Sequence, residues 1–264
     1  MNIKLADHNR NICTYENFIA YCPYCGHKNI YNRRDDLKTV QPISNKKVTC
    51  FSIVCNNDFY INGDMLAEKY EYFIFEAQEL IREKKYMHTI TTLATSCESF
   101  FYHAVKVKLV YEPFKDKIFK DLDTMNKLFK LVDLNIKKYS FESMKKLFIY
   151  LYFSNIKFKN ADEISSFTSG LSKFDMDGSL KEITKTMVSN RDIKMKILFY
   201  KVRNLNINEL RNLVVHKKAY RPTSDEAQQV IDSVTNVLVS TKIKFNIQSE
   251  DNYINNNFRI RKIT

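Results

Sequence analysis

Apolar residues recur every three or four positions along most of the chain after residue 67. This spacing is typical of amphipathic helices that bury one face. One such face runs through the stretch Tyr86 to Leu109 and consists of Ile90, Ala94, Cys97, Phe101 and Ala104. The stretches 118–136, 141–153, 180–188 and 192–202 follow the same pattern. The pattern therefore predicts a bundle of helices.

Glycine and proline mark where these helices end. No glycine and only one proline, Pro113, occur between Asp64 and Ser169, so long helices can form there. Pro222 precedes the sequence Thr-Ser-Asp-Glu, and this capping box predicts a last helix from Thr223 to about Val239. The stretch 160–178 ends at a glycine, and we expect it to be an irregular insertion.

The first 66 residues have a different pattern. Short β-prone segments, KKVTCFSIV and DFYI, occur here, and the second runs into the turn signal Asn62-Gly63. We therefore predict two domains, a small β-rich module over residues 1–66 and a helical domain over residues 67–264. The predicted fold class is mainly α.

Five of the six cysteines lie in the β-rich module. Cys22 and Cys25 form a C-x-x-C pair followed by a glycine, and two thiolates at this spacing can bind one ion. Cys50 and Cys55 form a second pair with a longer loop. Together the four thiolates predict a structural, tetrahedral zinc site, which a module too small for a large core would need.

Alternatives for these cysteines follow from the same spacing. The pair Cys50 and Cys55 could instead be buried thiols in a small core, and His27 is the substitute ligand if one cysteine is out of place. Cys13 has no partner at ligand spacing, and Cys97 lies on an apolar helical face, where we expect a buried thiol. The four-cysteine arrangement resembles a zinc ribbon, a family in which the metal is mostly structural.

The formal net charge of +12 changes the picture of possible partners. The β-rich module carries +2 and the rest of the chain +10, so the helical domain supplies most of the positive field. Such a charge favours a polyanion, either nucleic acid or a membrane surface, or it is simply a lysine-rich solvated surface. The longest apolar run, residues 147–153, is too short to span a bilayer, and the N-terminus lacks an apolar signal segment. We therefore expect a cytoplasmic protein without a membrane partner.

The segment ELRNLVVHKKAYRP, residues 209–222, holds the strongest candidate chemistry. On a helical wheel of about 100° per residue, Leu210, Leu213 and Val214 form one stripe. Arg211, Asn212 and His216 then point away from that stripe, with Val215 among them. Arginine can hold a phosphate with two donors, and histidine can move protons near neutral pH. The alternative is an ordinary basic helix end.

The same segment resembles the last helices of a HEPN domain. That family has an arginine, an adjacent polar residue and a histidine after four to six intervening residues, positions that Arg211, Asn212 and His216 match. The family begins with two long antiparallel helices, here about 67–84 and 86–111, and the second often carries a polar residue near the site. Glu98 is the matching residue, although it could equally face solvent. The resemblance covers about 67–240, with residues 112–200 as inserted helices.

The HEPN resemblance implies a metal-independent endoribonuclease that acts as a homodimer, in antiviral defence or as a toxin. Its catalytic residues would be Arg211, Asn212, His216 and Glu98, with zinc only in a structural role. The residues that follow the motif would contact RNA: Lys217, Lys218, Tyr220 and Arg221. A trigger or inhibitor protein is not identified. Two alternatives remain, a non-catalytic RNA-binding scaffold dimer and a zinc-ribbon DNA-binding regulator. Phosphate-binding and metalloprotease motifs do not occur.

Overall fold

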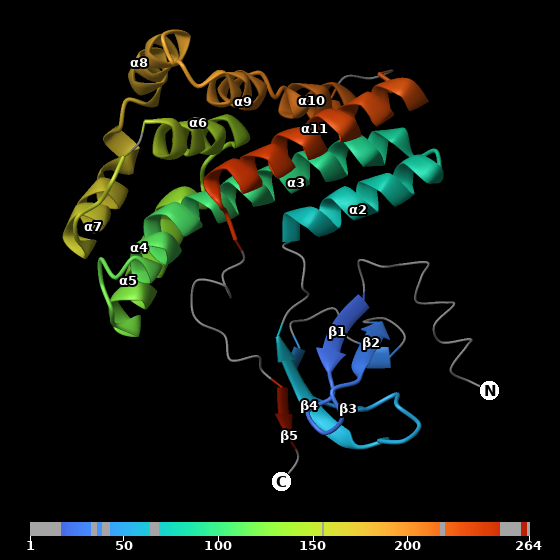
Figure 1. Ribbon diagram of the computed structural model, residues 1–264. Coiled ribbons are helices and arrows are strands. Elements are labelled where there is room, and N and C mark those ends of the chain that lie inside the picture. Colours follow the sequence, from blue (N-terminus) through green and yellow to red (C-terminus); the bar gives the residue numbers. More distant parts are fainter. Residues whose placement is uncertain are drawn as a thin grey trace. The chain divides into compact units, whose positions relative to one another are not determined.

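The computed structural model describes residues 17–32, 36–38, 43–63, 69–154, 156–216, 220–248 and 260–262. The chain divides into two compact units. One unit comprises Met1–Glu68 together with Asn255–Thr264, and the other comprises Lys69–Ile254. The protein is mainly helical, with a small β region, as the sequence predicts (Figure 1).

The β-rich unit contains two small antiparallel sheets. Strands β1 (Asn17–Tyr21) and β2 (Lys28–Asn32) form a hairpin. Strands β3 (Ile43–Thr49) and β4 (Asp58–Gly63) form a second hairpin, and β5 (Ile260–Lys262) pairs with the free edge of β4.

Two details of this unit differ from the sequence-based expectation. The signal Asn62-Gly63 does not form a turn, because both residues belong to β4 and Gly63 pairs with Ile43. The C-terminal strand β5 adds to the sheet of this unit, whereas the sequence assigned residues 67–264 to the helical domain. No periodic pattern could signal so short a strand.

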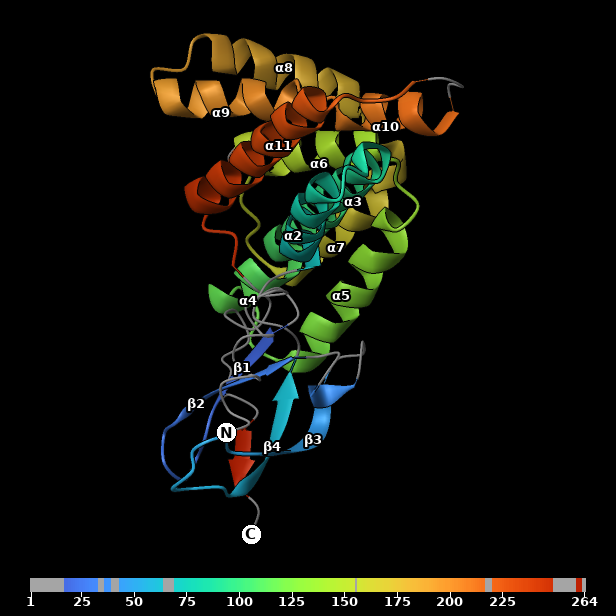
Figure 2. The ribbon, with the colours of Figure 1, turned by 90° about the vertical axis from the view of Figure 1, so that its right-hand side faces the viewer.

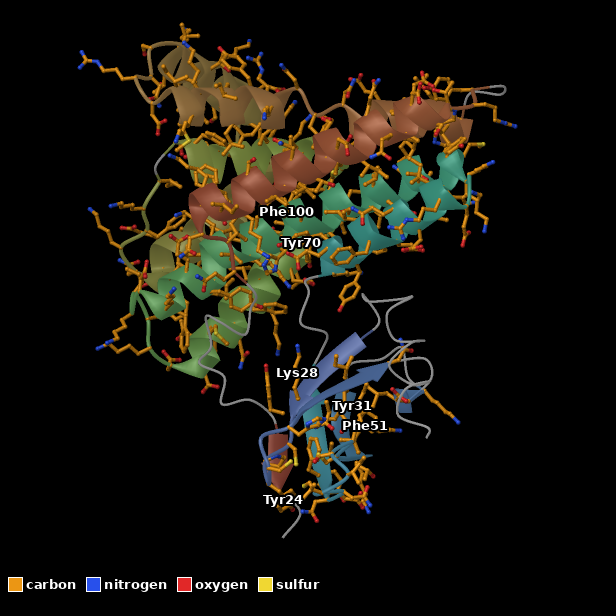
Figure 3. All side chains as sticks on the ribbon, turned by 45° about the vertical axis from the view of Figure 1, so that its right-hand side comes forward. Tyr24, Lys28, Tyr31, Phe51, Tyr70 and Phe100 are labelled. Carbon is orange, nitrogen blue, oxygen red and sulfur yellow. The ribbon has the colours of Figure 1, made fainter. Side chains whose placement is uncertain are left out.

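The core of the β-rich unit is small. Among the described residues it consists of nine buried residues, Ala20, Cys22, Tyr31, Leu37, Ile43, Val48, Cys50, Phe59 and Ile61. The Tyr31 ring lies 4.8 Å from the Phe51 ring, and its hydroxyl donates to the Thr49 carbonyl at 2.8 Å. Figure 3 shows Tyr31 and Phe51 side by side. A unit of this size gains stability from a cross-link between its hairpins, because a small domain has little room for a hydrophobic core.

The helical unit is built around a long central helix. Its helices are α2 (Lys69–Arg82), α3 (Tyr86–Lys106), α4 (Glu112–Lys115), α5 (Leu122–Ile136), α6 (Phe141–Phe153), α7 (Ala161–Gly170), α8 (Met176–Val188), α9 (Ile193–Arg203), α10 (Ile207–His216) and α11 (Ser224–Phe245). A π-helical turn, Val107–Tyr111, links α3 to α4. Helices α2, α6, α10 and α11 all pack against α3 (Figures 1 and 2).

Aromatic residues fill the centre of this bundle. The rings of Phe101 and Phe148 lie 5.1 Å apart, and both side chains are fully buried. The Tyr70 ring of α2 meets the Phe100 ring of α3 edge to face at 5.0 Å. Figure 3 labels both residues. The first contact joins α3 to α6, and the second joins α2 to α3, the two helices that occupy the positions that the sequence predicts. Within the described residues, no helix has the length and apolar character needed to cross a bilayer.

Local capping explains where many helices begin. A side-chain oxygen just before the helix accepts a backbone N–H of its first turn, which removes one of the unpaired donors. Such caps are present at Asp121, Ser140, Asn160, Asp175, Asp192 and Thr223. The predicted capping box is confirmed, since Thr223 and Glu226 bond each other's backbone reciprocally. Helix α11 continues to Phe245, beyond the expected end at Val239.

The stretch 160–178 is largely helical, so the expectation of an irregular insertion is wrong. Asn160 caps α7 by accepting from the Glu163 N–H at 2.9 Å, and Asp175 caps α8 by accepting from the Gly178 N–H at 2.9 Å. Gly178 therefore lies inside the first turn of α8. A Cβ at this position would meet the Asp175 carboxylate, so the glycine favours the cap instead of breaking the helix.

Candidate functional site

The four predicted metal ligands lie together. The Sγ atoms of Cys22, Cys25, Cys50 and Cys55 are all within 4.8 Å of one another, and both the Cys22–Cys55 and the Cys25–Cys50 pairs are 3.7 Å apart. A disulfide would need about 2.05 Å. Four thiolates around one ion with metal–sulfur bonds of about 2.3 Å would lie about 3.8 Å apart in a tetrahedron. This cluster can therefore hold a metal ion.

Two turns of the same shape present these thiols. In the first, the Gly26 N–H donates to the Cys22 carbonyl at 2.9 Å. In the second, the Asn56 N–H donates to the Ser52 carbonyl at 2.9 Å. Gly26 and Asn56 both have positive φ, 73° and 45°. Asparagine tolerates this conformation better than most other residues with a side chain.

The equivalence of the two turns explains the longer spacing of the second cysteine pair. Ser52 occupies the place that Cys22 has in the first turn, so that place offers no thiol. The fourth sulfur comes instead from Cys50, two residues earlier, where β3 has ended. The Ser52 N–H lies 3.5 Å from the Cys50 sulfur and faces it. The sequence predicts the four ligands but not this duplicated turn.

Asn29, which the sequence analysis did not single out, joins the two turns. Its side chain is buried, and its amide group donates to the Ala20 and His27 carbonyls at 3.3 and 2.9 Å. Its Oδ1 accepts the Phe51 N–H at 2.7 Å, in the second turn. Its alternation with Tyr31 on the buried face of β2 is the one signal that could have identified it.

The thiols of the cluster do not ionise alike. Burial opposes ionisation of Cys22, but the backbone N–H groups of Tyr24 and Cys25 hold its pKa below the ordinary value. The His27 N–H favours ionisation of Cys25, yet desolvation and the other thiols outweigh it and raise its pKa to about 12. Burial likewise raises the pKa of Cys50. Once one thiolate has formed, a second thiolate beside it is stable only if a cation is bound between them. Metal binding would therefore release protons from the remaining thiols.

Cys97 and His27 take no part in this cluster. His27 is exposed and lies outside the group of four ligands. Cys97 is fully buried in the helical core, where burial raises the pKa of its thiol. This confirms the expected buried thiol. Cys13 lies outside the residues that the structure describes.

The second candidate site lies on α10. Ile207 and Val214 of this helix are buried, Leu210 and Leu213 are half-buried, and the helix packs against α3. The stripe that the helical wheel predicts is thus on the inner side. Asn212 and His216 are exposed, one turn apart, and 52% of the Val215 surface is open to solvent.

Arg211 and Glu98 meet between α10 and α3. Arg211 Nη1 lies 3.9 Å from Glu98 Oε1, and the two side chains are 41% and 42% exposed. Arg211 Nη1 also lies 3.4 Å from Asn208 Oδ1. A guanidinium has five N–H donors, so most remain available for a phosphate. The structure thus brings together two residues that are far apart in the sequence. Within the described part of the chain, no hydrogen bond engages the His216 or Asn212 side chain.

Residues after the motif are only partly described. Lys217 and Lys218 lie outside the described residues. Tyr220 is half-buried and packs against the helical core, and burial together with Glu226 raises the pKa of its hydroxyl. Arg221 is exposed and donates to the Tyr220 carbonyl at 3.1 Å. Arg221 is therefore accessible to an anion, whereas Tyr220 packs against the core and interacts with Glu226 at the start of α11.

Lys145 of α6 positions the start of α10, a role that the sequence does not indicate. Its side chain is 8% exposed, and Nζ donates to the Leu205 carbonyl at 3.0 Å, just ahead of α10. Nζ also pairs with Glu142 at 2.9 Å. These two partners offset the cost of burying an ammonium. The segment before α10 is thereby fixed to α6.

Comparisons with known proteins add no relative. No protein-family model matches the chain, and searches of curated proteins and of solved structures gave no significant match. The HEPN and zinc-ribbon resemblances therefore rest on this chain's own residues and their arrangement.

Proposed function

We propose that this chain is a metal-independent endoribonuclease. The observation that supports it best is the approach of Arg211 to Glu98 across α10 and α3, with the Asn212 and His216 side chains exposed on the same helix. A guanidinium that can hold a phosphate and an imidazole that can move a proton are the two groups that RNA cleavage without metal requires. The HEPN resemblance of the segment 209–222 points to the same activity.

The proposed reaction uses the RNA's own 2′-hydroxyl as nucleophile. His216 accepts the proton of this hydroxyl. The 2′-oxygen then forms a bond to the neighbouring phosphorus, and the bond from phosphorus to the 5′-oxygen breaks. The leaving oxygen takes a proton from an imidazolium or from water. The products are a 2′,3′-cyclic phosphate and a 5′-hydroxyl. Arg211 stabilises the charge that develops on the phosphate, Glu98 orients the guanidinium, and Asn212 orients its neighbours.

We also propose a homodimer. One α10 offers a single Arg211 and a single His216, and two copies related by a two-fold axis would line one cleft. Val215 supports this arrangement, because it is a half-exposed apolar residue that lies between Arg211 and His216 on the helical wheel. A partner surface would cover it more favourably than water does.

The proposed metal of the four-cysteine cluster is zinc. An all-thiolate, four-ligand, closed arrangement suits a structural zinc ion, and the 3.7 Å sulfur separations agree with zinc–sulfur bond lengths. Zinc would cross-link two hairpins that share a core of only a few residues. It would have no part in RNA cleavage.

One experiment tests the activity. Purified protein is incubated with total RNA in the presence of a chelator, and the new ends are mapped. We expect 5′-hydroxyl ends paired with cyclic or 3′-phosphate ends, and we expect DNA of the same sequence to stay intact because it lacks the 2′-hydroxyl. RNA that is bound but never cut would contradict the proposal and would favour a non-catalytic scaffold.

A further inference from the structure

A groove runs between α9 and α11. Its volume is about 730 Å³, and Lys196, Tyr200 and Lys201 of α9 face Asn236 of α11 across it. A smaller hollow of about 190 Å³ shares Asn206 and other lining residues with it and extends along α11. Leu210, which directly precedes Arg211, lines this hollow. The groove thus leads to the helix that carries the proposed catalytic residues.

The charged residues that line the groove are Lys196, Lys201 and Asp232, and Glu226 lines the adjoining hollow. Helix α9 carries four basic residues, Lys194, Lys196, Lys201 and Arg203, and no acidic residue. The part of α11 that follows Asp232 carries Lys242 and Lys244, which pair with Glu71 and Asp192 and do not line the groove. Asp232 is the acidic residue that lines the groove, and it accepts a hydrogen bond from Gln228 at 3.0 Å. A polyanion therefore fits this surface.

The walls of the groove also offer the groups that bind bases. Tyr200 is half-buried, and its ring lies 5.3 Å from the Phe199 ring, which holds it in place. Such a ring provides a face for base stacking. The amides of Asn204, Asn206 and Asn236 can donate to and accept from base edges.

The groove's lysines can still take phosphate. Lys201 Nζ donates to Asn236 Oδ1 at 2.9 Å, and Lys196 Nζ donates to the Val188 carbonyl at 2.8 Å. Each ammonium has three donors, so two remain on each.

From these features we propose that the groove between α9 and α11 binds single-stranded RNA. This inference deepens the proposed ribonuclease function, because the strand would be the substrate. Phosphates would pair with Lys196 and Lys201, and a base would stack on Tyr200. The exposed Ile193 and Ile197 at the edge of the groove would contact bases or riboses. A protein helix is a poorer occupant, because its apolar face would bury two lysines and three asparagines without partners.

The test separates binding from cleavage. The probe is a fluorescent single-stranded oligonucleotide in which every ribose is 2′-O-methylated, so that it cannot be cut by its own 2′-hydroxyl. Its affinity for the full chain is measured by anisotropy over a range of salt concentrations. The groove variant is Lys196→Gln with Lys201→Gln. The matched control is Lys181→Gln with Lys185→Gln, which removes the same charge from exposed positions on α8.

We expect the groove variant to bind at least about tenfold more weakly. Its slope of log affinity against log salt should fall by about 1.4, since each lost phosphate contact on a single strand changes it by about 0.7. Tyr200→Leu should weaken binding without changing the slope. The control pair should bind like the wild type.

Two results would overturn the inference. One is an equal loss of oligonucleotide affinity in the control variant, Lys181→Gln with Lys185→Gln. This would show that the loss reflects net charge and not the groove. The other is unchanged oligonucleotide binding with an altered oligomeric state, which would assign the groove to a protein partner. Cleavage of native RNA by the wild type and its loss in His216→Ala are scored separately. The ribonuclease proposal and the groove proposal can therefore fail independently.

Discussion

Arg211 Nη1 and Glu98 Oε1 lie 3.9 Å apart, although more than a hundred residues separate them in the chain. The pair forms where α10 crosses α3, and both side chains keep a large part of their surface in contact with solvent. An exposed pair of this kind contributes at most about 1 kcal/mol to stability. Its main consequence is therefore the orientation of the guanidinium, which is held without being covered.

Substitution of the motif should separate catalysis from folding. We expect His216→Ala to lower the rate of RNA cleavage by roughly 10²–10⁴-fold, because a proton-transfer group is lost. Arg211→Ala should cost about 10²–10³-fold, because a charge stabiliser is lost. Asn212→Ala should cost less. The control is His88→Ala, an exposed histidine on α3. Initial rates on a defined RNA in chelator check this, and full activity of His216→Ala would refute the assignment.

The four-cysteine cluster should bind one zinc ion per chain. Elemental analysis of freshly purified protein should give a ratio near one, and Cys22→Ser should lower it sharply, because three thiolates no longer close the site. A strong chelator should unfold the β-rich unit and leave the helical signal in circular dichroism largely intact, because the two units have separate cores. The control is Cys97→Ala, which should keep the metal. A metal-free wild type would contradict the prediction.

Asn29→Ala should weaken the same site without removing a ligand. The substitution leaves the Phe51 N–H and the Ala20 and His27 carbonyls without their partner, at a cost of about 1–3 kcal/mol. Zinc affinity should fall by roughly 10–100-fold, as for other residues that orient metal ligands. Competition with a chromogenic chelator measures this. Asn57→Ala, at an exposed position beside Cys55, should have a smaller effect. Equal affinities for wild type and Asn29→Ala would contradict the role of this amide.

Lys145 and its neighbour Lys146 offer a matched pair for the start of α10. Lys145→Met leaves the buried Leu205 carbonyl and Glu142 without an ammonium, and the free energy of unfolding should fall by about 1–3 kcal/mol. Lys146 pairs with Asp177 at the surface, so Lys146→Met should cost less than about 1 kcal/mol. Denaturant titrations of both variants provide the comparison. Equal costs would show that Lys145 does not fix this segment.

Much of the helical unit could be predicted from the sequence because its signals are local. Three- and four-residue spacing predicts α3 and α6, and the Thr223–Glu226 capping box predicts where α11 begins. The expectation of an irregular insertion at 160–178 is wrong because glycine usually ends a helix, whereas Gly178, beside the capping Asp175, belongs to the first turn of α8. Strand β5 and the contacts of Asn29 depend on pairing across long sequence distances, which no local pattern contains.

The candidate sites also combine features that have a local sequence signal with features that have none. The spacing of Cys22 and Cys25 is a local signal, and it predicts a cluster that the structure forms. The proximity of Glu98 to Arg211 was expected only from the HEPN resemblance, because spacing within one helix cannot say which residue a second helix places opposite. Lys145 was missed for the same reason. The catalytic roles stay predictions.

Dimer formation through α10 should depend on Val215. Val215→Glu places a charge on the proposed two-fold face. Because burying an unpaired charge is costly, we expect the dissociation constant of the dimer to be at least about tenfold higher than in the wild type. Val188→Glu is the control, because Val188 is similarly exposed on α8, 57% against 52%. Analytical ultracentrifugation with and without RNA measures the change. A wild type that stays monomeric at micromolar concentration would contradict the dimer.

Strand β5, at residues 260–262, pairs with β4, at residues 58–63, and the whole helical unit lies between them in the chain. The sheet is therefore discontinuous in sequence. During synthesis the four thiols and both hairpins emerge early, whereas the third strand emerges only after every helix. The β-rich unit would thus exist first as a metal-bound intermediate with an open sheet edge, and its edge would close last. An open strand edge is a site of unwanted pairing, so the pairing of residues 260–262 with β4 would cover an edge that stays exposed until the helices have been made.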